Sequence, residues 1–280
     1  MEGNIMKKFF QYILMTVALI VTASCSNELD EVLQPAGNGS LQFVVSDFPA
    51  FQNSSPESGE VPQAEGSALT RVIGTQDVGK TAWDIDDQII VTLTSKKFGA
   101  QSAVLTYNGT SWSTAVSLSY LDNETPVVSA IYAPCYEVTE EGAMQLRSGM
   151  QPGMTEYIPA NCSFANDAVS INFAEVTRNY SRLRIVADAG QKLTVVTTDF
   201  TPAGATETAT ASYTLTTDNN GNAFLYGTFA EGATVSVKHG DVLLIDYAFT
   251  TGNNPGGTES GKSYALDARP VIDGTSGGVA

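Results

Sequence analysis

The chain has 280 residues, of which 14 are Lys or Arg and 30 are Asp or Glu, so its formal net charge is −16. A surface this acidic repels nucleic acid phosphates and anionic lipid head groups, which excludes nucleic acid as an expected partner. The roughly 255 residues that follow position 25 are too many for one typical domain and suffice for two.

The first 25 residues predict an exported lipoprotein. Lys7 and Lys8 precede an apolar run over 9–21, which is too short for a stable membrane span and has the flanks of a signal peptide. Small residues then lead to Cys25, and lipoprotein signal peptidase cuts before a cysteine that carries a lipid. We expect removal of residues 1–24, a lipid such as palmitate on Cys25, and an acidic flexible tether over 25–39. An ordinary secretory signal with a stray cysteine is the alternative.

The rest of the chain predicts an all-β protein. Short β-rich runs and turn signals alternate roughly every 8–12 residues, as in antiparallel sandwiches, and helical periodicity is nearly absent. A boundary within 161–167 gives two β-sandwich domains, 40–165 and 166–280. The expected strands are 40–48, 88–94, 102–107, 111–116, 127–132, 169–173, 182–187, 192–198, 211–217, 223–228, 234–238, 242–249 and 262–266.

Three loops stand out between these strands. Residues 52–67 are rich in Ser, Pro, Gly, Glu and Gln, which predicts an exposed loop that proteases can reach. Asn108-Gly109 predicts a hairpin, because a type I′ turn needs positive φ at both central positions. Residues 218–222, Asp-Asn-Asn-Gly-Asn, predict another turn.

The residues that could carry chemistry do not form a catalytic pattern. His239 lies in an expected hairpin turn, where a solvated role is the more common one, and no nucleophile motif or phosphate-binding loop is present. The acidic run 84–87 could bind Ca²⁺, but it lacks the glycine and bidentate Glu of a known loop and fits an acidic turn at a strand entry. We therefore expect no enzyme activity, no cofactor and no metal.

Two further groups of residues leave alternatives open. Cys135 and Cys162 could form a disulfide in the oxidising envelope or remain two buried thiols. Four aromatic residues could form a platform for sugar stacking or belong to the sandwich core, and these are Trp83, Trp112, Tyr107 and Tyr120.

Six segments form a pattern along the chain, and these are Leu69-Thr70-Arg71-Val72, the strand entry 83–91, the hairpin 107–113, the strand end 129–134, the second-domain opening 173–186 and the closing strand 261–266. In this order they resemble the fimbrillin family of Bacteroidetes, and Leu69-Thr70-Arg71-Val72 is similar to its processing site. The acidic residues 28–31 resemble the surface-export signal of Bacteroidetes lipoproteins.

This resemblance implies two tandem transthyretin-like β-sandwich domains and a role in a fimbria that supports adhesion. The precursor would reach the cell outer membrane through its lipid, and an Arg-specific surface protease would cut between Arg71 and Val72. The cut would remove the tether, the strand 40–48 and the loop to 71. Other pilin subunits would then add a strand to the open edge, so the processed chain would belong to the fimbrium.

The end of the sequence bears on the position in such a fibre. Residues 269–280 are poor in alternating apolar side chains, so they make a weak donor strand. This favours a tip or minor subunit, which accepts a strand without giving one. The alternative function is a surface lipoprotein that keeps its lipid and binds a glycan or another ligand.

Overall fold

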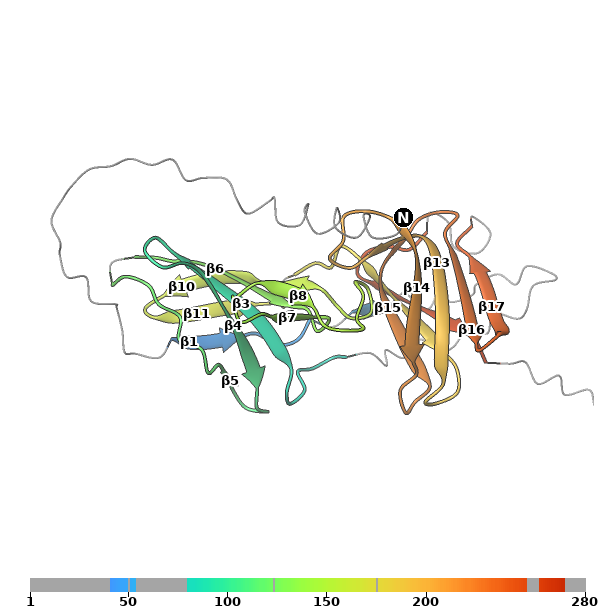
Figure 1. Ribbon diagram of the computed structural model, residues 1–280, viewed down its shortest axis with the longest axis horizontal. Helices are drawn as coiled ribbons and strands as arrows, with labels where there is room; N and C mark the ends of the chain where they lie inside the picture. The colour runs from blue at the N-terminus through green and yellow to red at the C-terminus, as the bar shows by residue number, and fades with distance from the viewer. Residues whose placement is uncertain are drawn as a thin grey trace, which may run out of the picture. The chain divides into compact units, whose positions relative to one another are not determined.

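The computed structural model describes residues 41–49, 51–53, 80–122, 124–174, 176–250 and 257–269. All of them belong to one unit, Pro35–Ala280. Their regular secondary structure consists of β-strands, arranged in several largely antiparallel sheets (Figure 1). The predicted all-β sandwich class is confirmed.

A five-stranded antiparallel sheet forms one layer of the first core. Its strands follow the spatial order β5 (Trp112–Ser113), β4 (Gly99–Tyr107), β3 (Gln88–Ser95), β6 (Val127–Tyr132) and β9 (Ile158–Pro159). β3 lies in the middle, and its alternating apolar side chains are fully buried at Ile89, Val91 and Leu93. Alternation with a period of two therefore places one face of the sheet in the core.

A three-stranded sheet forms the opposing layer. β11 (Ala168–Asn172) lies between β10 (Asn161–Ala165), which is antiparallel to it, and β1 (Gln42–Val45), which is parallel. Val169 and Ile171 of β11 lie in one buried cluster with Ile89 and Val91 of β3. A separate antiparallel hairpin consists of β7 (Tyr136–Val138) and β8 (Met144–Leu146).

The second core lies within an eight-stranded sheet that folds over itself. The sheet runs β17 (Val242–Ala248), β16 (Thr234–His239), β13 (Lys192–Pro202), β15 (Asn222–Phe229), β12 (Ser181–Val186), β18 (Lys262–Asp267) and β2 (Gln52–Asn53), with β14 (Ala209–Thr216) paired to β13. β13 pairs with β16 before a bulge and with β15 after it. Asp199, inside the bulge, has a φ of 47°. A bulge bends a strand, and here it lets one strand serve two layers.

The turn that joins β10 to β11 corrects the expected boundary. Asn166 and Asp167 both have positive φ, at 51° and 58°, between the paired residues Ala165 and Ala168. Two such central residues define a type I′ hairpin turn, and Asn and Asp tolerate this conformation. β11 consequently pairs within the first set of sheets, and the change from the first core to the second follows Phe173 rather than residue 165.

The other two expected turns are present, with one difference in geometry. Gly109 has a φ of 94°, but Asn108 is not among the residues with positive φ, so this hairpin is not type I′. The Asn108 side chain instead accepts hydrogen bonds from the N–H groups of Thr110 and Ser111. In the second turn, Asp218 accepts from the N–H groups of Asn220 and Asn222 in the same way.

Burial of tyrosines predicts a loss of stability at high pH. Burial is the first cause that raises the pKa of four tyrosines from 10.0 to about 12, and these are Tyr120, Tyr136, Tyr213 and Tyr247. A folded pKa above the unfolded value leaves stability unchanged below pH 10, and stability falls as the pH rises from 10 towards 12. Absorbance at 295 nm, followed with circular dichroism, should show a late tyrosinate group near pH 12. Titration of all tyrosines near pH 10 in a folded protein would contradict this.

Candidate functional site

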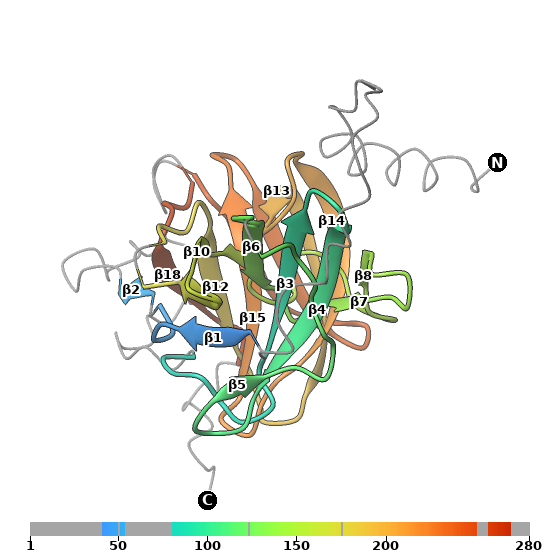
Figure 2. The same cartoon turned by 90° about the vertical axis from the view of Figure 1, so that its left-hand side faces the viewer.

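The most unusual feature of the fold is the segment of residues 41–49 and 51–53, which we call the leading segment. Its strand β1 lies parallel to β11 at an open edge, and its strand β2 lies parallel to β18 at the edge of the other sheet (Figures 1 and 2). Gln42 pairs with Ala168 in the first sheet, and Gln52 pairs with Lys262 in the second. A short stretch of chain thus adds an edge strand to both sheets.

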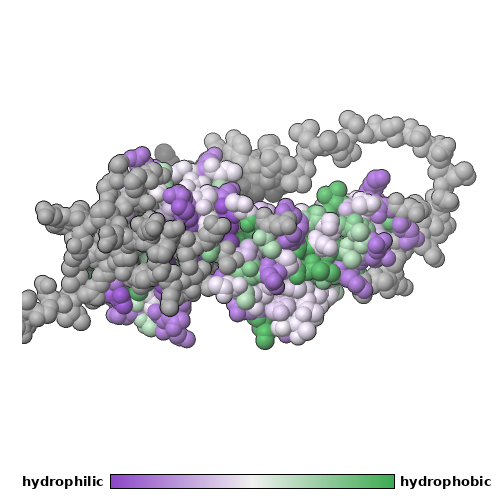
Figure 3. Space-filling view, turned by 180° about the vertical axis from the view of Figure 1, so that it is seen from behind, coloured by the Kyte–Doolittle hydropathy of each residue, from purple (hydrophilic) through white to green (hydrophobic). Residues whose placement is uncertain are grey.

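Side chains of β1 alternate between the core and solvent. Leu41, Phe43 and Val45 are partly buried against the first core, whereas Val44 points outwards and is 60% exposed. This is the pattern of a strand that covers an apolar groove with one face. Figure 3 shows the molecule from the side opposite to Figure 1. Hydrophobic residues gather there over the half of the described chain that includes the first core, and hydrophilic residues lie between them.

Polar contacts and an aromatic ring fix the chain after β1. The carbonyl of Ser46 accepts a hydrogen bond from Trp83 Nε1 at 2.8 Å, and the hydroxyl of Ser46 accepts one from the N–H of Phe173 at 2.8 Å. Phe48 is 6% exposed and makes edge contacts with Trp83 and Tyr132, with ring centroids 4.9 and 5.6 Å apart. The leading segment is therefore held by the same core that it covers.

Phe51 lies between β1 and β2 of the leading segment, directly before β2. Its ring is 5% exposed and lies 4.0 Å from Arg178 Cζ and 4.7 Å from Arg182 Cζ, measured to the ring centroid. Arg178 also donates a hydrogen bond from Nη2 to the carbonyl of Pro49. Cations close to an aromatic face are attracted by its quadrupole, and more strongly when water is excluded.

Arg178, the nearer of the two arginines at Phe51, belongs to a buried ion pair. Arg178 Nε donates to Glu156 Oε2 at 2.6 Å, and both side chains are 4% exposed. Tyr180 donates its hydroxyl to the same oxygen at 3.1 Å. Burial raises the pKa of the Glu156 carboxyl, and the charges and hydrogen bonds of its partners oppose that rise. Removing either partner would leave a charge in a dry environment.

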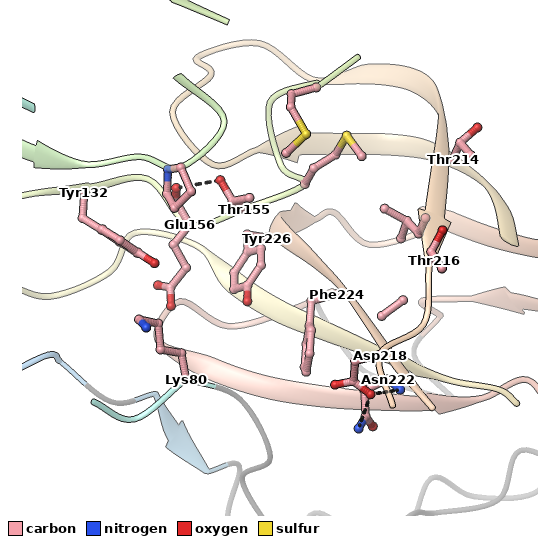
Figure 4. A pocket seen from close by; sticks show the side chains of 15 residues that line it. Lys80, Tyr132, Thr155, Glu156, Thr214, Thr216, Asp218, Asn222, Phe224 and Tyr226 are labelled. Carbon is pink, nitrogen blue, oxygen red and sulfur yellow. Dashed lines mark hydrogen bonds between the residues drawn. The ribbon is translucent and has the colours of Figure 1, made fainter. Parts of the chain in front are cut away.

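A pocket of about 540 Å³ adjoins this pair. Figure 4 shows Glu156 among Lys80, Tyr132 and Tyr226 on one side of it, with Thr214 and Thr216 on the other. Glu156 Oε1 accepts no hydrogen bond from the residues that the structure describes. The protein thus holds the carboxylate through one oxygen, and the other oxygen is buried without a hydrogen bond from the described residues.

The sequence-predicted processing residues cannot be placed in this geometry. Cys25, Arg71 and Val72 lie outside the described residues, as do the expected signal peptide, the expected tether, residues 54–79 and residues 270–280. Cys135 and Cys162 are described, and both are free thiols. Cys135 is buried after β6 and donates to the carbonyl of Gln151, while Cys162 is partly buried on β10. Of the two alternatives, the structure has separate thiols.

The acidic run 84–87 is held by ion pairs and a hydrogen bond, and His239 lies at the end of a strand. Lys80 forms ion pairs with Asp84 and Asp87, and the N–H of Asp84 donates to Asp87 Oδ2 at 2.7 Å. Within the described ranges, no group of three or more His, Cys, Asp or Glu side chains could hold a metal ion. His239 is exposed at the end of β16, with Nδ1 3.0 Å from the carbonyl oxygen of Lys192.

The four aromatic residues do not form one sugar-binding face. Trp83 is partly buried and packs against the first core, with its ring in contact with those of Trp112, Tyr132 and Phe173. Tyr120 is 5% exposed and contacts Phe164 in a separate cluster. The core alternative therefore describes Trp83 and Tyr120, and only Tyr107 and Trp112 stack together near the surface, with centroids 5.1 Å apart.

Sequence reasoning missed the contacts of Phe51, Arg178 and Glu156. Phe51 follows Pro49 outside any alternating run, so no strand pattern includes it. Arg178 and Glu156 carry charges, which usually indicate the surface. A usable signal was the motif Phe48-Pro49-x-Phe51, since two large rings beside a proline are unusual in a loop that has nothing to bury.

Comparison with known proteins gives a weak structural likeness. No protein-family model matches the sequence, and no curated protein matches it either. One similar solved structure is that of a proposed cell adhesion protein from Bacteroides fragilis, with 9% identity and a TM-score of 0.43 over 84% of this chain and 95% of the other. Such a score assigns neither a family nor a function. In the part of the chain that the structure describes, no helix has the length and apolar character needed to cross a membrane.

Proposed function

We propose that this chain is a structural subunit of a cell-surface fibre of the fimbrillin type, which supports adhesion and is joined to its neighbours by strand addition. The precursor would be carried to the outer membrane by the lipid on Cys25 and cut after Arg71. The observation that supports this proposal is the leading segment. It precedes the proposed cut, and it supplies an edge strand to each of two sheets.

Loss of the leading segment would expose a sheet edge that the strand of another subunit can pair with. The buried side chains Val169, Ile171 and Phe173 would lose their cover of Phe43, Val45 and Phe48. Each large apolar side chain that is exposed costs about 1.5–3 kcal/mol, and β11 would also present unpaired backbone groups. A strand from another subunit restores both kinds of contact, so assembly is the expected outcome. A tip or minor position in the fibre is part of this proposal.

Replacing Arg71 tests the cut. Arg71→Ala should leave the protein on the membrane with Cys25 and its lipid attached, and material sheared from wild-type cells should begin at Val72 in N-terminal sequencing. Arg71→Lys is the matched control, because it keeps the positive charge but is a poor substrate for an Arg-specific protease. It should behave like Arg71→Ala. Unchanged size and assembly in both variants would exclude the proposed processing.

The alternative is a lipoprotein that keeps its lipid and binds a glycan. It has less support, because Tyr120 is buried and the partly buried ring of Trp83 packs against the first core. The Tyr107–Trp112 pair is the remaining candidate surface for it. Glycan binding that is lost in Trp112→Ala, together with permanent retention of Cys25, would favour this alternative.

A further inference from the structure

Two buried arginines lie close to the ring of Phe51. Arg178 and Arg182 are 5% and 1% exposed, and both lie within 5 Å of the ring centroid of Phe51. Arg182 is also 5.5 Å from the ring of Phe224, so its guanidinium contacts two rings. An aliphatic side chain would fill the space but would lack the quadrupole that attracts the cations.

Groups outside the leading segment also contact both arginines. Arg178 is paired with Glu156 at 2.6 Å, and Arg182 Nε donates to Ser263 Oγ of β18 at 3.0 Å. Residues that follow the proposed cut therefore contribute to the positions of both guanidinium groups. They would remain available to whichever strand occupied the place of the leading segment.

The parallel pairings add a direction to this site. β1 runs parallel to β11, and β2 runs parallel to β18, with Phe51 immediately before β2. A strand that makes the same backbone bonds must enter in the same direction. Its apolar side chains must occupy the places of Phe43 and Val45 before a ring reaches the arginines. The site thus constrains the direction of the strand that occupies it and the spacing between that strand's apolar side chains and its aromatic ring.

We infer that Arg178 and Arg182 form an aromatic clamp that selects the incoming strand of another subunit. The selected strand runs parallel to β11, carries alternating apolar residues, and places an aromatic ring at the position of Phe51. This inference rests on the proposed function, because it requires the leading segment to be exchangeable. It goes further by stating which side chain the partner must carry and where.

Peptide exchange on the full chain tests the clamp without depending on Arg71. A recognition sequence for a site-specific protease is inserted between residues 54 and 79, the folded chain is cut there, and a fluorescent peptide with the sequence of residues 41–53 is added in excess. Uptake is followed by fluorescence anisotropy. The peptide should replace the cut segment and bind in a saturable way.

Peptide variants then separate the ring from hydrophobicity and charge. Phe51→Leu should bind about tenfold more weakly, since a desolvated cation–π contact is worth one to two powers of ten in affinity. Phe51→Trp should bind at least as well as Phe. Val44→Ala is the matched control, because Val44 points to solvent, and its affinity should not change. In the chain itself, Arg182→Met should reduce the difference in affinity between the Phe and Leu peptides, because only Arg178 would still contact the ring.

Three results would overturn the inference. Equal binding of the Phe51→Leu and native peptides would show that any apolar side chain suffices. Stronger binding of Phe51→Glu than of the native peptide would show that the arginines select charge. Absence of uptake of the native peptide would show that the site does not accept a strand in trans. Failure of the cell-based Arg71 experiment would leave the peptide results standing, so the two proposals fail separately.

Discussion

Replacing Arg178 with methionine is expected to lower the free energy of unfolding by about 3–5 kcal/mol, because it leaves the carboxylate of Glu156 buried without its cation. The side chains of Arg178 and Glu156 are each 4% exposed. Arg178 also donates a hydrogen bond to the carbonyl of Pro49 and contacts the ring of Phe51. Urea unfolding followed by tryptophan fluorescence measures the change. The free energy should be compared at equal m-values, since a changed slope would indicate a different unfolded or native state.

A double variant and a surface variant make this prediction specific. Arg178→Met combined with Glu156→Leu removes both charges and should recover most of the loss, because an apolar pair needs no desolvation of ions. Lys262→Met breaks the exposed pair with Glu259 and should change stability by about 1 kcal/mol at most. If Arg178→Met costs no more than Lys262→Met, the buried pair does not have the energetic role that its geometry indicates.

Shortening Phe173 to alanine should cost about 3–5 kcal/mol, the range for a large ring removed from a closed core. Phe173 has 0% exposure, its ring lies 5.4 Å from that of Trp83, and its N–H donates to the hydroxyl of Ser46. The cavity would lie directly beneath the leading segment. We therefore expect faster proteolysis of that segment as well as a lower urea midpoint.

Phe98→Ala is the control for this substitution. Phe98 is 36% exposed at the turn after β3, so its removal should change the free energy of unfolding by less than about 1 kcal/mol. Similar losses for the two variants would mean that the core beneath the leading segment is not closed.

The sequence predicts the strands whose side chains alternate and whose ends carry turn residues. β6 has the expected bounds, 127–132, and the strands from β11 to β18 appear within a few residues of their expected ranges. Alternation is a local property, so it can be read directly from the chain. The strands β2, β7, β8, β9 and β10 have two to five residues each and lie outside the expected strands.

Pairing between distant strands has no local signal. Nothing in residues 42–45 indicates that they join β11 in a parallel arrangement, since a parallel edge strand and an antiparallel one look alike in sequence. The turn at Asn166-Asp167 was read as a boundary because two polar residues occur both in linkers and in hairpins. The buried Arg178–Glu156 pair was missed for a related reason: burial of charge depends on a partner that the sequence separates by 22 residues.

The pairing of the leading segment also constrains the order in which the chain can fold. Ser46 bonds with Phe173, 127 residues further along, and β2 needs β18, which is later still. Contacts this distant in sequence form slowly, because a long loop must close before they contribute. Along the chain, residues 41–53 precede all of their pairing partners, and they find those partners last. The sheet of β3, β4 and β6 can therefore form while the leading segment is still unpaired, and under the proposed processing the segment that pairs last is also the one that is removed.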